Sequence, residues 1–218
     1  MQSIHNYDVY IFDCDGVILD SNKLKIEAME EALRDLGFEA TLIEKCIDYF
    51  KNNFGLSRFH HVEIFLDKFL NIEPDQKDNI RPKILNKFSD QCHNLYLEAK
   101  ITPGFIELIT SLKGKKYIAS GSEEFGLIRA FKERGLEHLF SSIYGSPETK
   151  SNIIFKILDK EHSKKAIMFG DAISDFEAAK KNGIDFIAYT PYSNVKDTLI
   201  MLATNNGYNV VNSWSEVK

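Results

Sequence analysis

The spacing of hydrophobic residues divides the chain into two parts with different patterns. Between about Asp20 and Lys100, hydrophobic residues recur every three or four positions, which predicts helices and no strands. The helices expected there are one that ends before Gly37, one that ends near Gly55, one from Ser57 to Leu70 and one that follows Pro82. We therefore predict that this stretch forms a helical unit of its own.

The pattern changes after Thr102, where short hydrophobic runs alternate with helical segments. The runs predicted as strands are Lys116–Ala119, Ser142–Tyr144, Ala166–Phe169, Asp185–Tyr189 and Tyr208–Val211. Alternation of this kind predicts βαβ units and a parallel sheet that is covered by helices on both faces.

One further strand, Val9–Phe12, resembles these runs but is separated from them by the helical stretch. We therefore predict an α/β protein with a discontinuous core. Residues 1–19 and 101–218 would form a Rossmann-like parallel sheet core, and residues 20–100 an inserted α-helical cap domain.

The composition is that of a soluble globular protein, with 44% hydrophobic and 27% charged residues among 218. A net charge of −5 leaves no basic stripe for phosphate backbones, which argues against a nucleic-acid partner. Three cysteines suit a reducing compartment better than a disulfide framework. Because no membrane-length apolar run and no signal-peptide pattern is found, we expect a cytoplasmic protein with no membrane partner.

The first candidate for chemistry is the pair Asp13 and Asp15, which ends the first strand and is followed by Gly16. On an extended backbone, side chains two residues apart point to the same side, so both carboxylates would lie together. Such a pair repels unless a proton or a cation lies between the two groups, and Mg²⁺ prefers oxygen ligands. The alternative is an ordinary acidic turn, because Asp-Gly is a common turn sequence.

Other polar residues follow the later strands, and ligands of an open parallel sheet bind beyond the carboxyl ends of its strands. Ser120-Gly121-Ser122 follows one strand, Gly170-Asp171 with Asp175 follows another, and Lys150 begins a helix between them. Each has a simpler interpretation: a helix cap for Ser120-Gly121-Ser122, a turn for Gly170-Asp171, and a solvated side chain for Lys150. Together, acids for a metal and a hydroxyl and a lysine for an anion are what phosphoryl transfer requires.

These residues, in this order, resemble the four motifs of the haloacid dehalogenase-like (HAD) superfamily. The motifs are Asp13-Cys14-Asp15-Gly16-Val17, Ser120, Lys150, and Gly170-Asp171 with Asp175. The helical insertion after the first motif resembles the cap of subfamily I, so the resemblance covers nearly the whole chain. One difference is Ser151, because many relatives have proline after the motif lysine.

The resemblance implies a role for each residue. Asp13 would be the nucleophile, and Asp15 would be the general acid and then the base that activates water. Mg²⁺ would be held by the Asp13 carboxylate, the Asp15 backbone carbonyl and Asp171, with Asp175 binding directly or through water. Ser120, the Gly121 N–H and Lys150 would bind the phosphoryl oxygens.

The expected function is Mg²⁺-dependent hydrolysis of a phosphomonoester through an aspartyl-phosphate, with a small phosphorylated metabolite as substrate. A sugar phosphomutase of the β-phosphoglucomutase type shares the four motifs, and a phosphate- and metal-binding module without turnover is a third alternative. In the cap, Arg58 is expected to reach a carboxylate or second anionic group of the substrate. The alternative for Arg58 is an exposed position at a helix N-terminus. The oligomeric state is left open, and a monomer would suffice for cap closure.

Overall fold

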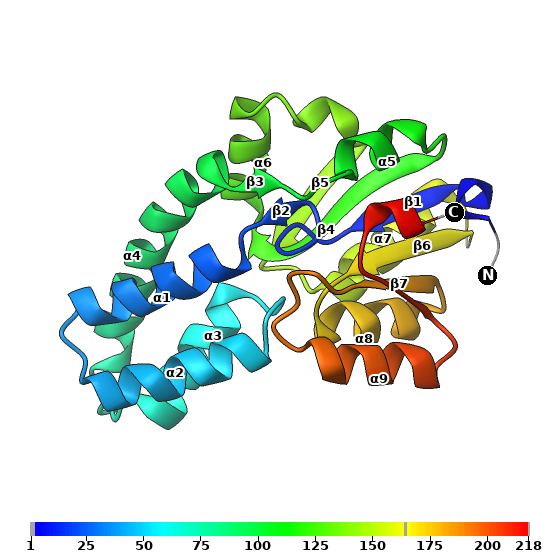
Figure 1. The fold of residues 1–218 in the computed structure, drawn as a ribbon. Helices are drawn as coiled ribbons and strands as arrows, with labels where there is room; N and C mark the ends of the chain where they lie inside the picture. The colour runs from blue at the N-terminus through cyan, green and yellow to red at the C-terminus, as the bar shows by residue number, and fades with distance from the viewer. Residues whose placement is uncertain (1–2, 164, 218) are drawn as a thin grey trace.

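The computed structural model describes residues 3–163 and 165–217, and within this range a parallel sheet of six strands forms the core (Figure 1). The strand order is β5-β4-β1-β6-β7-β8, so the first strand of the sequence lies in the middle of the sheet. The strands are β1 Val9–Phe12, β4 Lys115–Glu123, β5 Ser142–Ser146, β6 Ala166–Gly170, β7 Asp185–Tyr189 and β8 Asn209–Val211. The predicted parallel sheet and each of its strands are confirmed.

The central strand β1 is buried on both faces, which is why its sequence is continuously hydrophobic. Val9 and Ile11 belong to the apolar cluster on one face, and Tyr10 and Phe12 to the cluster on the other. The first face is covered by α7 Lys150–Glu161, α8 Ile173–Asn182 and α9 Lys196–Asn205. The second face is covered by α5 Phe105–Ser111 and α6 Glu124–Glu133.

The helical region is inserted between two short strands, β2 Leu19–Asp20 and β3 Lys100–Ile101, which pair with each other in antiparallel fashion. Figure 1 shows its helices gathered to one side of the sheet. They are α1 Asn22–Asp35, α2 Ala40–Asn52, α3 Arg58–Ile64, the π-helical η2 Phe65–Phe69 and α4 Lys77–Glu98. The predicted helical insertion is confirmed, and the domain limits proposed at residues 19/20 and 100/101 fall in the β2–β3 ribbon.

Three short 3₁₀ helices complete the described elements: η1 Ile4–Asn6, η3 Glu137–Leu139 and η4 Trp214–Glu216. None of the helices in the described ranges is long and apolar enough to cross a membrane.

The predicted start of the fourth cap helix after Pro82 is wrong, because α4 begins five residues earlier at Lys77. A proline in a helix removes one backbone hydrogen bond. Here the burial of Ile84, Phe88 and Tyr96 along the same helix outweighs that loss.

The interpretation of Ser120-Gly121-Ser122 as a helix cap is also wrong. These residues lie within β4, which continues to Glu123 although its register with β5 shifts after Ala119. The cap of α6 is instead Glu123, whose side chain accepts hydrogen bonds from the backbone N–H groups of Phe125 and Gly126. The Ser120 and Ser122 side chains therefore do not cap α6 and can make other contacts.

The single tryptophan, Trp214, joins the C-terminal segment to the core. Its ring stacks on Tyr189 with a centroid distance of 3.9 Å, and its Nε1 donates to Thr102 Oγ1 at 2.9 Å. Thr102 Oγ1 in turn donates to the Val17 carbonyl, in the loop that carries the first motif. These contacts connect the C-terminal segment to the loop that carries the first motif.

We predict that Trp214→Ala lowers the free energy of unfolding by about 3–5 kcal/mol, because it removes a buried indole and leaves a cavity. Urea unfolding followed by far-UV circular dichroism measures the change. Met201→Ala is the control, because Met201 is 53% exposed and its replacement should change the stability by no more than about 0.5 kcal/mol. Equal unfolding midpoints for the two variants would contradict a stabilising role of the Trp214 side chain in the core.

Candidate active site

The candidate site lies beyond the carboxyl ends of three adjacent strands, β4, β1 and β6. Asp13 directly follows β1, and Asp171 directly follows β6. Asp175 lies in the first turn of α8, and Lys150 is the first residue of α7. The predicted residues thus come from four separate segments that the parallel topology brings to one edge.

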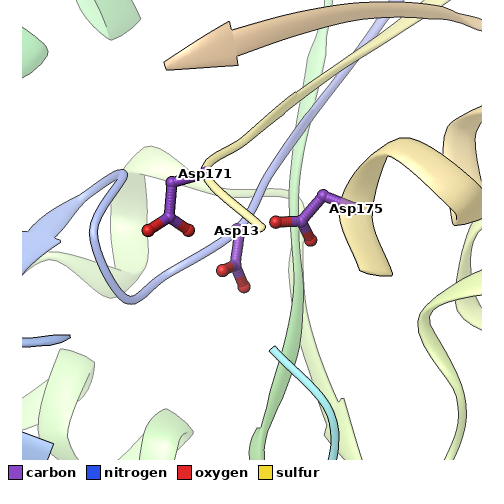
Figure 2. A group of neighbouring side chains, drawn as sticks. All are labelled: Asp13, Asp171 and Asp175. Carbon is purple, nitrogen blue, oxygen red and sulfur yellow. The ribbon is translucent and has the colours of Figure 1, made fainter. Parts of the chain in front are cut away.

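Three carboxylates meet at this edge, as Figure 2 shows for Asp13, Asp171 and Asp175. One carboxylate oxygen from each lies within 4.8 Å of the others, and all three residues are buried. Asp175 is oriented by a hydrogen bond from the Ala172 N–H to its Oδ2 at 3.0 Å. Gly170 permits this arrangement, because a Cβ at that position would lie 2.2 Å from the Asp175 Cβ.

The cluster carries more negative charge than the protein itself offsets. Lys150 Nζ lies 3.0 Å from Asp13 Oδ1 and also contacts Asp175. Burial would lower the pKa of Lys150, but the Asp13 and Asp175 carboxylates outweigh it and the pKa is raised. Burial raises the pKa of Asp13 to about 7, against the opposing effect of Lys150, and the pKa of Asp171 is also raised by burial and by the Asp13 and Asp175 charges.

A magnesium ion suits this set of groups. The donors are all carboxylate oxygens, and Asp171 Oδ1 accepts no hydrogen bond from any residue of the described ranges. A divalent cation would also remove the charge repulsion that raises the pKa of Asp13 and of Asp171. Asp13, Asp171 and Asp175 are therefore the residues that would hold it, and a contribution from the Asp15 backbone carbonyl remains a prediction.

The Asp15 carboxylate faces a different set of groups. It accepts hydrogen bonds from Ser21 Oγ at 2.6 Å, Lys25 Nζ at 2.9 Å, Ser122 Oγ at 2.9 Å and Tyr96 OH at 3.1 Å. Burial alone would raise the pKa of Asp15, but Lys25 and the hydroxyl donors hold it below its usual value.

The expectation that Asp13 and Asp15 share one cation by lying on the same side of a strand is therefore corrected. The strand ends at Phe12, and the backbone turns after Asp13, with the Ile18 N–H bonded to the Cys14 carbonyl. The alternation of an extended strand does not reach Asp15. Each acid has its own lysine, Lys150 for Asp13 and Lys25 for Asp15.

The structure also places the residues expected to bind phosphate. Lys150 is buried in ion pairs, so the interpretation as a solvated side chain is wrong. Ser120 is buried, and its Oγ accepts a hydrogen bond from the Ser122 N–H at 3.1 Å. Gly121 lies directly under the cap, because a Cβ there would be 2.3 Å from the Gly55 carbonyl oxygen. Contacts of these three residues with phosphate remain a prediction.

The cap is closed onto the core in this structure. Gly55 has a φ of +88°, and a Cβ on it would lie 2.4 Å from Ser174 Oγ and 3.1 Å from Lys150 Nζ. Arg58, in the first turn of α3, is buried with its guanidinium carbon 5.1 Å from the Phe88 ring centroid. The alternative of an exposed position for Arg58 is therefore wrong, while its contact with substrate stays a prediction.

Sequence reasoning missed Asn22, which links the cap to the carboxylate cluster of Asp13, Asp171 and Asp175. Its Nδ2 donates to Asp171 Oδ2 at 2.6 Å and to the Tyr192 carbonyl at 2.9 Å. Gly16 makes room for this bond, because a Cβ there would lie 2.2 Å from Asp171 Oδ2. Asn22 stands at the start of a helix, where a polar residue is ordinarily a surface cap, so the sequence carried no signal of burial.

Lys25, Tyr96 and Ser122 were missed for a similar reason. Lys25 and Tyr96 lie on amphipathic cap helices, where a lysine or tyrosine is unremarkable in the sequence. Ser122 was recognised only as part of the turn after β4. Their common partner, the Asp15 carboxylate, becomes visible only in the folded chain.

We predict that the metal-free protein loses stability as the pH rises from about 4 to about 7. The raised pKa of Asp13 means that the folded protein keeps a proton which the unfolded chain releases over this range, so ionisation favours unfolding. Thermal unfolding in a chelator at several pH values measures the effect. Asp13→Asn should make the melting temperature depend less on pH, and saturating Mg²⁺ should have a similar effect on the wild type. If the melting temperature of the wild type and of Asp13→Asn falls equally with pH, the Asp13 carboxyl is not the cause.

We predict that Asn22→Ala weakens Mg²⁺ binding by about 10- to 100-fold, because Asp171 loses the donor that orients it. Titration calorimetry with Mg²⁺ measures the affinity without any need for turnover. Lys23→Ala is the matched control on the same helix, since the Lys23 side chain is 87% exposed and should leave the affinity unchanged. Equal affinities for the two variants would show that the Asn22 bond has no influence on the metal site.

Known proteins resemble this chain in sequence and in fold. A phosphoglycolate phosphatase of Vibrio parahaemolyticus is 28% identical over 189 residues, which cover 79% of this chain and 78% of that protein. A predicted phosphoglycolate phosphatase from Haemophilus somnus has a TM-score of 0.76 at 16% identity, covering 99% of this chain and 98% of its own. A β-phosphoglucomutase from Clostridium difficile has a TM-score of 0.73 at 19% identity, covering 97% and 93%. At these identities the two structures establish the fold alone.

The family model described as haloacid dehalogenase-like hydrolase matches residues 10–189. The matched range contains the carboxylate cluster, Lys150 and the whole helical insertion. The resemblance drawn from the four motifs and the expectation of an enzyme of this kind are confirmed. The chain belongs to the haloacid dehalogenase-like hydrolase family, with an inserted helical cap.

Proposed function

We propose that the protein is a Mg²⁺-dependent phosphomonoester hydrolase that works through an aspartyl-phosphate on Asp13. The observation that supports this most directly is the buried cluster of Asp13, Asp171 and Asp175 around Lys150. A nucleophilic carboxylate and a phosphate are both anions, and they approach each other only where positive charge offsets their repulsion. Mg²⁺, when bound, would supply that charge together with Lys150.

In the first step an Asp13 carboxylate oxygen attacks phosphorus, and the bond from phosphorus to the ester oxygen breaks. Lys150 holds Asp13 in place at 3.0 Å, so the nucleophile is oriented before the substrate arrives. Asp15 protonates the leaving oxygen. The negative charge of a bound substrate favours the protonated form of Asp15 that this step needs.

In the second step water attacks the phosphorus of the aspartyl-phosphate, which releases inorganic phosphate and restores Asp13. Asp15, now a carboxylate, takes the proton of that water. Lys25, Ser21, Ser122 and Tyr96 all donate to this carboxylate, and they favour the charged form that acts as the base.

The substrate we propose is a small phosphorylated metabolite, with phosphoglycolate as the first candidate. Two relatives from Vibrio species with 28% and 24% identity are phosphoglycolate phosphatases. A cleft between cap and core, with a volume of about 360 Å³, reaches Gly121 and Lys150 and offers an approach for a small molecule. Arg58, buried in the closed cap, is the residue we propose for a second anionic group of the substrate.

We predict that Asp13→Asn lowers the rate of phosphate release by at least about 10³-fold, because the amide cannot attack phosphorus. Phosphate release from a panel of phosphomonoesters is measured with Mg²⁺ and with a chelator, and wild-type activity should require the metal. Asp8→Asn is the control, since Asp8 is exposed at the opposite end of β1. Wild-type release that is independent of Mg²⁺, or that survives in Asp13→Asn, would refute the proposal.

A further inference from the structure

A second, much smaller cavity lies between the cap and the core on the side of Asp15. Its free volume is about 10 Å³, which is room for about one water molecule. Three basic residues line it, Lys25, Arg58 and His61, and aromatic walls are formed by Phe50, Phe54 and Phe88. The basic residues are nearly inaccessible to solvent, with 8% of Lys25, 8% of Arg58 and 1% of His61 exposed.

Arg58 is a buried cation without a compensating anion. Lys25 is paired with Asp15, and Lys150 with Asp13, but Arg58 forms no ion pair with any carboxylate in residues 3–163 and 165–217. Its Nε donates to no group in the same ranges. An arginine stays charged at all ordinary pH values, and burying such a charge unpaired is costly.

His61 is left in the same condition. Neither ring nitrogen has a well-formed hydrogen bond to a residue of the described chain. Burial, together with the charges of His60 and Lys25, lowers the pKa of His61 to about 3 against the opposing effect of the Leu56 backbone. The ring is therefore neutral and offers one N–H donor without adding charge.

Contacts with aromatic rings hold the Arg58 and His61 side chains in place. The His61 ring lies edge-on against Phe50 with centroids 4.6 Å apart, and Arg58 lies over Phe88 at 5.1 Å. Among the described residues that line the cavity, none has a carboxylate side chain. Arg58 and His61 are thus hydrogen-bond donors held at fixed positions around a cavity that could receive an acceptor group.

The cavity lies where the leaving group of the proposed reaction would point. Lys25 belongs to its lining and also contacts Asp15, the proposed acid for the leaving oxygen, at 2.9 Å. Gly121, a proposed phosphate contact on β4, and its neighbour Ser122 line it as well. A substrate with its phosphorus at Asp13 would extend past Asp15 into this space.

We propose that the cavity binds a substrate carboxylate, with Arg58 and His61 as its hydrogen-bond donors and Lys25 as a neighbouring cation. This inference rests on the proposed phosphatase function and narrows its substrate class. With the cap closed this space holds about one water molecule, so a carboxylate, the most compact anionic group, would enter with a small displacement of the cap, whereas a second phosphoryl group or a sugar ring would need a larger one. The substrate class that fits this site is therefore a short phosphorylated hydroxy acid.

Two esters of similar size test the proposal, phosphoglycolate with a carboxylate and ethyl phosphate without one. With Mg²⁺ present, kcat/KM of the wild type for phosphoglycolate should exceed that for ethyl phosphate by about 100-fold or more. Arg58→Met and His61→Leu should each lower the phosphoglycolate value by about 10- to 100-fold and leave the ethyl phosphate value within about threefold. His61→Gln, which keeps a donor, should recover part of the loss, and Lys51→Met is the control at an exposed cap residue.

Stability separates this role from a merely structural one. Without substrate, Arg58→Met and His61→Leu should keep or raise the melting temperature, because they remove buried polar groups that have no partner. A lower melting temperature together with equal losses on both esters would overturn the proposal and make these residues structural.

The outcomes also distinguish this inference from the proposed function. Equal turnover of both esters by the wild type, abolished by Asp13→Asn, would overturn the carboxylate site and leave the phosphatase intact. Preference for a sugar bisphosphate that depends on Arg58 would overturn it in favour of a phosphoryl group. If neither ester nor any other phosphomonoester is hydrolysed, both proposals fail.

Discussion

Excess negative charge at the carboxyl edge of the sheet is the constraint on which the rest of the site depends. Asp13, Asp171 and Asp175 are buried within a few ångströms of each other and have one lysine between them. Ionised carboxylates are stable in such a place only with a compensating charge, and otherwise they take up protons. The raised pKa of Asp13 and of Asp171 reflects that imbalance, and a divalent cation, which prefers oxygen ligands, would resolve it.

Asp15 is stabilised in another way, and mainly by the cap. Lys25 belongs to the first cap helix and Tyr96 to the last, and both also bond to Ser122 of the core. A motion of the cap relative to the core must therefore break bonds at Asp15 or Ser122. Lys150 of the core contacts Asp13, the proposed nucleophile, whereas Lys25 and Tyr96 of the cap donate to Asp15, the proposed acid, so the environment of Asp15 depends on the position of the cap.

The cap can approach the core closely because glycine residues, which have no side chain, lie at the contact. A Cβ on Gly121 of β4 would lie 2.3 Å from the carbonyl oxygen of Gly55 in the cap, and a Cβ on Gly55 would lie 2.4 Å from Ser174 Oγ of the core. The same closure surrounds Arg58 and His61 with aromatic rings and leaves their donors facing a small space. Under the proposed function, a cap that closes this tightly would limit the size of the substrate.

The sequence by itself determined the sheet, the helical insertion and the residues at the strand ends. Buried parallel strands are short runs of hydrophobic residues, and the acids that follow β1 and β6 lie next to them in the chain. Only the tertiary structure decided what surrounds Asp15 and Asp171. Tyr96 is 81 residues from Asp15, and Asn22 is 149 residues from Asp171. Contacts between residues so far apart depend on how helices pack, and a local pattern does not encode that geometry.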